Sequence, residues 1–495
     1  MKNLLKQCVN AFEERTGLVT LFIGIARHPV PPGTGWLYVF GSCVLTCLVI
    51  QVVTGIALST RYIASSGSTY AVLQFITHKA VFGNFLRGMH YFGASAMILL
   101  IGVHMIQVFL MGCYKYPREL NWITGVLLLF LVVAIGFTGQ LLRWDQDAVW
   151  ATVLAAEMLG RTPFIGKYLA RFLLGGKTLG GATLSRFFAF HVFFLATFIL
   201  VIVAFHLYLV LHDGISAPPV RGQMVNPKTY RAEYDKLLAE RGVPFWPDVA
   251  WRDAVAAFIV VMTIAALALF VGPPELGGPP NPSLLASDPR PDWYMLWYFA
   301  VLAQLPRHME SVFMLGAPLF AIVFLLMVPV WWNKGERHPA RRPWAVIAVI
   351  TIVLSIVGFW IEGSRSPWSP KFDAQPLSAA LVGTTAGPVA VGAQLFHDKA
   401  CEFCHTIDGN GGQRGPDLTY VAHRLTVDDI KIRIADGGGN MPAFAGILTR
   451  DEMDDLVAFL ESRRVDRHVQ QSRAAAPSAS AHSASAERTV SESPR

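Results

Sequence analysis

The stretch GMHYFGASAMILLIGVHMIQVFLMGC, residues 88–113, carries no Asp, Glu, Lys or Arg and contains two histidines, His90 and His104. As a helix rising about 1.5 Å per residue, it is long enough to cross about 30 Å of hydrocarbon. The two histidines are fourteen residues apart. Fourteen residues of helix return to within about 40° of the starting direction and advance by about 21 Å. The pattern therefore predicts a membrane-spanning helix that presents two imidazoles on one face, near opposite membrane surfaces.

A second charge-free stretch, residues 187–211, repeats this arrangement with His191 and His206, which are fifteen residues apart. Ionisable side chains inside a span are costly and indicate a function. Both stretches run from the outer surface inward, so we expect His90 to face His191 near the outside and His104 to face His206 near the inside. Two facing pairs predict two stacked His–Fe–His sites, each for a non-covalent haem b. The alternative is four separate polar residues packed between helices, but two matched pairs favour haem.

Four glycines share the period of the histidines. Gly41 and Gly55 lie in the first apolar stretch, Gly125 and Gly139 lie in the third, and each pair is fourteen residues apart. A glycine has no Cβ and lets a flat macrocycle approach the backbone. Small residues also serve plain helix–helix packing. The shared period favours the haem interpretation.

Two arginines precede the outer histidines. Arg87 lies three residues before His90, and Arg186 lies five residues before His191. We expect them to pair with haem propionates, and the alternative is that they extend to the membrane surface to keep their charge in water.

The remaining composition is that of a membrane protein. Of the 495 residues, 53% are hydrophobic and only 15% are charged, which is too apolar for a pair of soluble domains. Seven stretches free of Asp, Glu, Lys and Arg are long enough to span a bilayer, at approximately 36–58, 88–113, 122–142, 187–211, 254–273, 312–333 and 343–361. The sequence therefore predicts an all-α, seven-span bundle, with a four-helix di-haem core over 36–211 and a three-helix part over 254–361.

The basic residues predict the orientation of the bundle. A net charge of +7 could indicate nucleic acid, but the loops explain it better through the positive-inside rule. One side carries the basic residues Lys2, Lys6, Arg15, Arg27, Lys115, Arg118, Lys334, Arg337, Arg341 and Arg342. We therefore expect a cytoplasmic N-terminus, a cytoplasmic loop over 212–253 and an outside C-terminus, although the 143–186 loop is also basic. Residues 1–35 lack the pattern of a cleaved signal peptide, and 4–22 predict one interfacial amphipathic helix.

The C-terminal part predicts a third haem. After a linker over 362–384, residues 385–464 have the composition of a soluble domain, and the Ala/Ser/Arg-rich tail 465–495 cannot build a core. The sequence Cys401-Glu402-Phe403-Cys404-His405 is the attachment pattern of a covalent haem c, with His405 as an axial ligand.

A methionine completes this pattern. Met441 follows thirty-six residues after His405 in GGGNMPAF and is a suitable sixth ligand. The alternative readings of CxxCH, a redox dithiol or half of a zinc site, do not explain this methionine. Haem c is attached outside the cytoplasm, which agrees with an outside C-terminus.

Several sequence motifs resemble those of a known family. They are TGIAL (54–58), KYPRELNWITGV (115–126), GFTGQLLRWDQ (136–146), TLSRFFAFH (183–191), DGIS (213–216) and PDWY (291–294). Over residues 1–361 the chain resembles cytochrome b of the quinol-oxidising cytochrome bc complexes, and it is most similar to the chloroplast and cyanobacterial branch. In that branch the last three spans form a separate subunit, whereas here they are fused to the first four. The cytochrome c domain takes the place of a separate c-type partner.

The resemblance implies a quinol-oxidation site in the outer loops 139–150 and 291–294. Asp292 resembles the carboxylate that accepts a quinol proton, although the family more often has glutamate there, and Tyr294 would hydrogen-bond in the same site. The alternative is an Asp that only caps a turn. Arg143 stands where the family has proline, which changes the shape of that loop.

The resemblance also implies partners and a reaction. The implied protein is a subunit of a respiratory or photosynthetic quinol:cytochrome c oxidoreductase in a bacterial cytoplasmic membrane, with bifurcated electron transfer and proton translocation. A Rieske-type iron–sulfur protein would be a separate chain, because its centre needs two Cys and two His and no spare set with suitable spacing exists here. A further electron acceptor and a homodimer are expected, and nucleic acid is not. The alternative function is a membrane haem anchor that passes electrons from quinol to a reductase without bifurcation.

The inner quinone site is less clearly marked. His212 and Asp213, just past the fourth span, are candidates for proton supply, and the alternative is that both are solvated loop residues. The matched branch carries an extra covalent haem on a cysteine near the start of the first span. Val39 occupies that position here and Cys43 lies one turn further on, so we expect no such haem, and the alternative is that Cys43 attaches it instead.

Overall fold

A computed structural model describes residues 2–176, 178–281, 290–366, 375–412, 415–437, 441 and 443–464. The predicted tail over 465–495 and the middle of the predicted linker lie outside the described residues. The chain divides into a membrane unit, formed by Met1–Pro280 with Ser287–Trp368, and a C-terminal unit, formed by Asn281–Ala286 with Ser369–Arg495.

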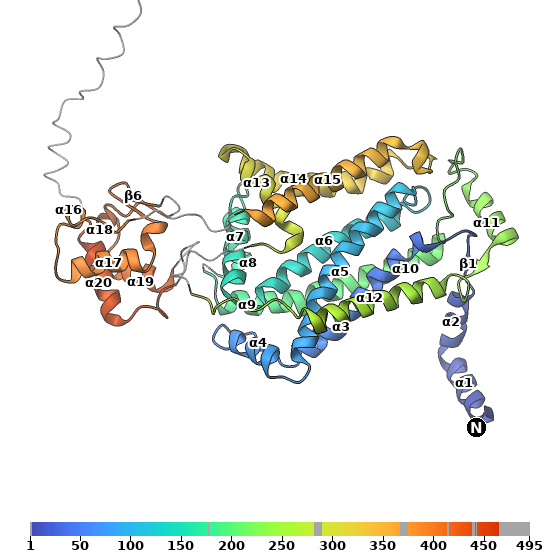
Figure 1. Ribbon diagram of the computed structural model, residues 1–495, viewed down its shortest axis with the longest axis horizontal. Coiled ribbons are helices and arrows are strands. Elements are labelled where there is room, and N and C mark those ends of the chain that lie inside the picture. The colour runs from blue at the N-terminus through green and yellow to red at the C-terminus, as the bar shows by residue number, and fades with distance from the viewer. Residues whose placement is uncertain are drawn as a thin grey trace, which may run out of the picture. The chain divides into compact units, whose positions relative to one another are not determined.

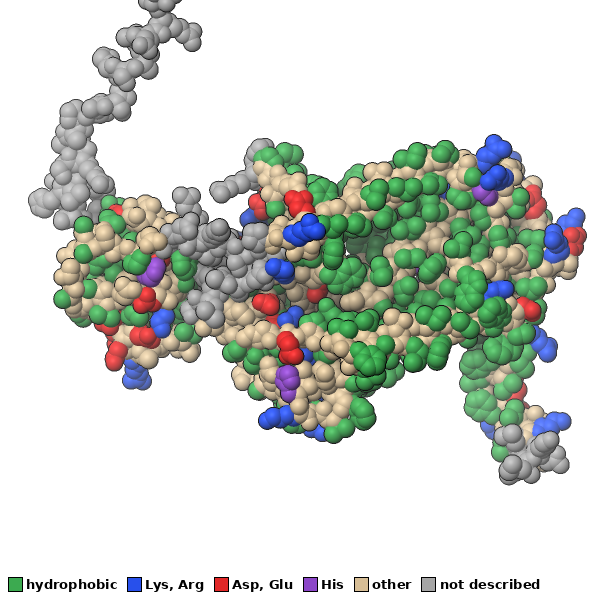
Figure 2. Space-filling view, in the orientation of Figure 1, with side chains coloured by type: hydrophobic (Ala, Val, Ile, Leu, Met, Phe, Trp, Pro, Cys, Tyr) green, Lys and Arg blue, Asp and Glu red, His purple; other side chains and the backbone are tan. Residues whose placement is uncertain are grey.

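Seven helices of the membrane unit are long and apolar enough to cross a bilayer (Figure 1). They are α3 (Phe40–Ser59), α5 (Gly83–Leu110), α6 (Glu119–Leu141), the continuous helix Gly181–Asp213, α12 (Ala250–Phe270), α14 (Arg307–Trp331) and α15 (Pro343–Arg365). Each overlaps one predicted span, which confirms the all-α, seven-span fold class. Hydrophobic side chains cover the flanks of these helices, whereas charged side chains gather at their ends (Figure 2). This is the surface that a bilayer would surround.

Shorter elements connect the spans. The helices are α1 (Lys2–Thr16), α2 (Leu18–Ala26), α4 (Thr69–His78), α7 (Gln146–Gly160), α8 (Gly166–Leu174), α11 (Tyr230–Arg241) and α13 (Leu296–Gln304). Three 3₁₀ turns are η1 (Trp36–Tyr38), η3 (Trp293–Met295) and η4 (Pro339–Arg341). Two-residue strands pair β1 (Pro29–Val30) with β3 (Val243–Pro244) and β2 (Met224–Val225) with β4 (Gly335–Glu336).

The N-terminal segment departs from the prediction of one amphipathic helix over 4–22. Gly17 adopts a left-handed conformation, with φ of 65°, and separates α1 from α2. Glycine reaches this conformation without the Cβ clash that other residues meet. The prediction of a single helix over 4–22 was therefore wrong, because two shorter helices, α1 and α2, cover this segment.

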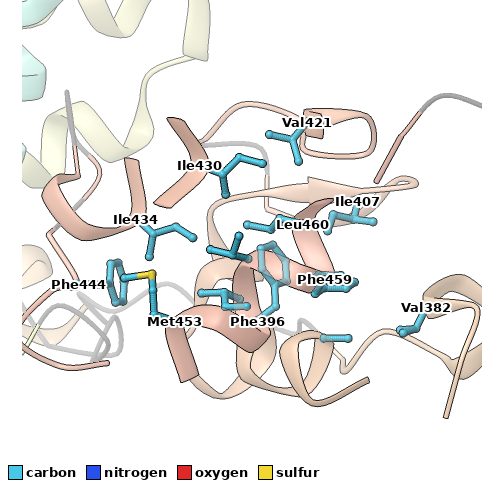
Figure 3. Packing of buried hydrophobic residues seen from close by; sticks show 13 residues of the cluster. Val382, Phe396, Ile407, Val421, Ile430, Ile434, Phe444, Met453, Phe459 and Leu460 are labelled. Carbon is cyan, nitrogen blue, oxygen red and sulfur yellow. The ribbon is translucent and has the colours of Figure 1, made fainter. Parts of the chain in front are cut away.

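The C-terminal unit is a small helical domain with its own core. Its elements are α16 (Ala379–Val382), α17 (Pro388–Asp398), η5 (Cys401–Phe403), the strand pair β5 (Thr406–Ile407) and β6 (Asn410–Gly411), α18 (Val421–Arg424), α19 (Val427–Asp436) and α20 (Arg450–Glu461). Phe396 of α17 and Phe459 of α20 pack with ring centroids 5.6 Å apart at the centre of the core (Figure 3). The two helices cross closely because Gly392 faces Asp455, where an added Cβ would lie only 2.0 Å from the Asp455 carbonyl oxygen.

Candidate haem and quinol sites

The four predicted glycines each face one of the four predicted histidines. On α3, a Cβ added at Gly55 would lie 3.3 Å from His90 Cε1, and one at Gly41 would lie 3.4 Å from His104 Cε1. On α6, a Cβ at Gly139 would lie 2.8 Å from His191 Cε1, and one at Gly125 would lie 3.7 Å from His206 Cε1. The histidine helices therefore lie against the glycine helices at two levels, as the common period predicts.

The outer pair has the separation that a metal between two imidazoles requires. The ring centroids of His90 and His191 are 6.3 Å apart. Metal–imidazole bonds of about 2.0 Å, with each nitrogen about 1.1 Å from its ring centroid, require a separation of about 6.2 Å. The residues present therefore fit an iron ligated on both sides.

The unequal spacings of the two histidine pairs have a structural cause. His191 lies in a π-helical segment, Phe190–Leu195, between α9 (Gly181–Ala189) and α10 (Ala196–Asp213). A π-bulge accommodates one extra residue without rotating the helix that follows. The fifteen residues between His191 and His206 thus act as fourteen, which matches the spacing on α5.

Three of the four imidazoles have their Nδ1 atoms engaged by the protein. His90 Nδ1 lies 2.9 Å from Thr54 Oγ1, and His206 Nδ1 lies 2.8 Å from Thr124 Oγ1. His191 Nδ1 lies 2.9 Å from the Ile135 carbonyl oxygen and 3.2 Å from Thr138 Oγ1. Ligating histidines usually donate the second ring N–H in this way, which leaves Nε2 for the metal.

The two arginines predicted beside the outer haem make contacts within the protein. Arg87 donates to Thr77 Oγ1 at 3.1 Å and to the Pro274 carbonyl oxygen at 2.6 Å. Arg186 donates to the Phe172 carbonyl oxygen and stacks on the Phe172 ring. Their pairing with propionates stays a prediction.

A cavity of about 590 Å³ opens at the inner pair, and both His104 and His206 line it. It extends past the first turn of α12 to the segment before α3, so His28, Tyr38 and Asp253 line it as well. His28 Nε2 and Tyr38 Oη are buried there without a hydrogen-bond partner among the described residues. Burial lowers the pKa of His28, which favours the neutral form of its imidazole. Polar atoms without partners in an apolar cavity are suited to a polar ligand.

The predicted inner-site residues lie beside this cavity but do not line it. Asp213 accepts a hydrogen bond from Arg231 at 2.8 Å, and His212 Nδ1 lies 3.1 Å from the same carboxylate oxygen. Sequence reasoning missed Asp253 because the fifth span was started one residue later, at 254. An ionisable residue in the first turn of a span was the signal that could have identified it.

The predicted quinol-oxidation residues lie together on the loop before α13. Tyr294 donates a hydrogen bond of 3.1 Å to Asp292 Oδ2, and a Cβ added at Gly136 of α6 would lie 2.8 Å from Tyr294 Oη. Gly136 lies one turn before Gly139, so this pair is close to the outer histidine level. Burial raises the pKa of Asp292, although the Tyr294 hydrogen bond and the charge of Arg143 oppose the rise. Burial and the neighbouring carboxylate also raise the pKa of Tyr294.

Arg143, in place of the family's proline, forms an ion pair with Asp145 at the end of α6. Asp145 is fully buried, caps α7 by accepting from Ala148 N at 3.0 Å, and accepts from Gly277 N at 3.1 Å. Asp145 therefore connects the loop after α12 to the start of α7.

The C-terminal unit places the CxxCH residues at the 3₁₀ turn η5. Cys401 and Cys404 are not disulfide-bonded. His405 Nδ1 lies 2.8 Å from the Pro416 carbonyl oxygen, and burial lowers the pKa of this imidazole. A neutral ring with Nδ1 engaged has Nε2 available for iron. Met441 packs against the hydrophobic core of the unit, and its role as sixth ligand stays a prediction.

Comparisons with known proteins match three parts of the chain to family models. Residues 95–279 match the family model "Cytochrome b(N-terminal)/b6/petB", and residues 279–381 match "Cytochrome b(C-terminal)/b6/petD". Residues 387–460 match "Cytochrome C oxidase, cbb3-type, subunit III". A solved structure described as hyperthermophilic respiratory Complex III is 25% identical, with a TM-score of 0.63, over 72% of this chain and 92% of that chain. The chain therefore belongs to the cytochrome b family, with the N-terminal and C-terminal parts of cytochrome b joined in one polypeptide and a c-type cytochrome domain after them.

Proposed function

We propose that this chain is the cytochrome b/c subunit of a quinol:cytochrome c oxidoreductase that oxidises quinol at the outer face with bifurcated electron transfer and proton translocation. The observation that carries the proposal is the pair of histidine levels on α5 and the fourth span, with Asp292 and Tyr294 near the outer level. When bound, two b haems and one covalent c haem supply the one-electron carriers that separate the two electrons of a quinol.

At the outer site, Asp292 takes one of the two protons that quinol loses on oxidation to quinone. Burial raises the pKa of Asp292, which suits a base that accepts a proton and later releases it. Tyr294 holds the carboxylate in place through its hydrogen bond to Oδ2. Gly136 leaves room for the tyrosine hydroxyl against α6.

At the inner site, His104 and His206 line the part of the cavity that the inner haem would fill, and the end lined by His28, Tyr38 and Asp253 would receive the quinone. His28, Tyr38 and Asp253 supply the polar atoms that line it, and they are the first candidates for proton delivery. His212 and Asp213 are second candidates for proton delivery. They lie at the end of the span that carries His206 but do not line the cavity.

The C-terminal domain receives the electron that does not enter the membrane pair. Cys401 and Cys404 would form the thioether links, and His405 and Met441 would be the axial ligands. A separate Rieske-type protein would deliver this electron. We further propose a homodimer in a bacterial cytoplasmic membrane, with the N-terminus in the cytoplasm and the cytochrome c domain outside.

Replacement of Asp292 tests the outer site. In the purified complex, we expect Asp292→Asn to slow quinol oxidation by roughly 10²-fold or more, the range for a lost general base, with both b-haem spectra intact. Asp292→Glu is the matched control and should retain most of the activity. The carboxylate must be ionised to accept a proton, so the wild-type rate should rise with pH through the raised pKa of Asp292. In Asp292→Asn this rise of the rate with pH should be absent. Loss of the b-haem spectra in Asp292→Asn would instead show a structural role.

A second measurement separates bifurcation from the simple haem anchor. The complex is first incubated with quinol. An oxidant that takes electrons from the iron–sulfur protein and the c haem is then added. Bifurcation requires the second electron to enter the b haems, so their reduction should increase. A simple anchor would show only oxidation of the b haems.

A further inference from the structure

The short helix α8 presents large apolar side chains on an exposed face. Phe164, in the turn before the helix, is 99% exposed, and Ile165, Tyr168 and Phe172 are each between 52% and 61% exposed. At about 100° per residue, Ile165, Tyr168 and Phe172 point within about 60° of one another around the helix axis. Large apolar side chains gathered on one exposed face indicate a surface that something other than water covers.

The opposite face of α8 fixes the helix on the membrane unit. Helix α8 contacts α7 and α9 at one end of this unit (Figure 1). Leu173 packs against a buried hydrophobic cluster that includes Leu141 of α6 and Leu184 of α9. A Cβ added at Gly166 would lie only 2.2 Å from the Gly160 carbonyl oxygen of α7, so these two helices pack closely. The fold therefore holds the aromatic face of α8 in a defined outward position.

This aromatic face continues onto the flank of the fourth span. The ring centroids of Phe172 and Phe190 are 5.9 Å apart, and those of Phe190 and Phe194 are also 5.9 Å apart. Phe198 follows, with its ring centroid 6.4 Å from that of Phe194. Phe194 and Phe198 are exposed on a helix that is long and apolar enough to cross a bilayer. The row of rings thus runs from α8 onto a surface that lipid would surround, and aromatic side chains are enriched where such a surface meets water.

The charges around α8 are all of one sign. Residues 158–186 contain five basic residues and no Asp or Glu. Two of the five, Lys167 and Arg171, lie one turn apart on α8 and are exposed. The Lys167 Nζ atom lies 5.3 Å from the centre of the Tyr168 ring, so its charge is beside the aromatic face. The positive-inside rule gives no reason for cations in a loop on the predicted outer side. They therefore point to an anionic partner.

We propose that α8 lies in the headgroup layer of the adjacent lipid leaflet and binds anionic phospholipid. Phe164, Tyr168 and Phe172 would enter the boundary between headgroups and acyl chains, and Lys167 and Arg171 would pair with the lipid phosphates. An amphipathic surface helix binds a membrane through its buried apolar area together with its attraction to anionic lipid. A second copy of this chain suits the surface less well, because a two-fold contact of this face with itself would bring like charges together. The inference goes beyond the proposed function and does not depend on the haem placement.

Photo-crosslinking of the purified protein in lipid vesicles tests the proposal. Phe164 is replaced by the photoreactive amino acid benzoylphenylalanine, and the protein is reconstituted in equimolar phosphatidylglycerol and phosphatidylcholine at low salt. After illumination, the molecule attached to the probe is identified by its mass. One basic residue near a membrane surface favours anionic lipid by about fivefold. Phosphatidylglycerol should therefore exceed phosphatidylcholine in the crosslinked product by at least about that factor.

The same probe at Phe198 is the matched control. Phe198 is exposed on the fourth span, which contains no Lys or Arg beyond Arg186, so the two lipids should crosslink there about equally. Lys167→Gln combined with Arg171→Gln should bring the lipid ratio at Phe164 close to that at Phe198. If this double variant does not fold, the comparison of the two probe positions in the unchanged background carries the test.

Two results would overturn the proposal. One is the same lipid ratio at Phe164 and Phe198 in the unchanged background, which would remove the role of the cations. The other is attachment of the Phe164 probe to protein in place of lipid, which would show that a second copy or another subunit covers this face. Neither result bears on the haem and quinol sites, so the proposed function is tested separately.

Discussion

The four glycines are not equally close to their histidines. A Cβ at Gly139 would lie 2.8 Å from His191 Cε1, a distance that real contacts do not reach, so the ring or the helix would have to move. Such overpacking typically costs about 1–3 kcal/mol. We therefore expect Gly139→Ala to lower the occupancy of the outer b haem, measured as the ratio of haem to protein in the purified complex.

Gly125 provides the matched control for that change. A Cβ there would lie 3.7 Å from His206 Cε1, which is ordinary van der Waals contact. Gly125→Ala should therefore disturb its histidine less than Gly139→Ala disturbs His191. Equal loss of haem from both variants would show that the glycines serve helix packing in general.

At the scale of one element, the fourth span is the unusual helix among the four that carry the histidine pairs and the glycines facing them. Its π-helical segment Phe190–Leu195 contains one residue more than a regular helix needs. Deletion of Phe194 would shorten the histidine spacing to that of α5 and allow this segment to become α-helical. Phe194 is 62% exposed, and the ring contacts that it makes are to Phe190 and Phe198 of the same span. We expect this variant to retain both b haems, as measured by redox difference spectra.

Deletion of Val201 in α10 is the control. The π segment would remain, and the turn of about 100° per residue would rotate His206 away from the inner site. If the π segment closed instead, Ile199, which is only 2% exposed, would move out of its buried position. Either response costs stability, so the inner haem should be lost more readily than in the Phe194 deletion. Retention of both haems in the Val201 variant would contradict the assigned role of the π segment.

The sequence predicted some elements better than others. The spans were predicted to within a few residues, because length and hydropathy largely determine them. The break at Gly17 and the π segment change neither the length nor the hydropathy of a segment, so these two measures did not predict them. The fifteen-residue spacing of His191 and His206 was nevertheless a signal of the π segment. His28 and Asp253 line the inner cavity because segments far apart in the chain pack together. The hydrophobic periodicity of the sequence does not report such packing.

At the scale of the whole molecule, the two units have separate hydrophobic cores. Residues from several helices build the core of the C-terminal unit, with Phe396 and Phe459 at its centre (Figure 3). The core of the membrane unit contains buried residues such as Cys47, Met97 and Ile199 on three membrane helices. Because the two cores share no residues, we expect each unit to fold and bind its haem without the other's cofactor.

Replacement of both Cys401 and Cys404 by serine in the full chain tests this independence. A haemochrome spectrum of the wild-type protein should show b and c haem in a ratio of about 2:1, as four intramembrane histidines and one CxxCH predict. The double variant should lose the c haem and keep both b haems. Quinol should still reduce the b haems, but electron delivery to the acceptor should fall, because the exit branch has lost its carrier. Loss of b haem together with c haem would contradict independent folding of the two units.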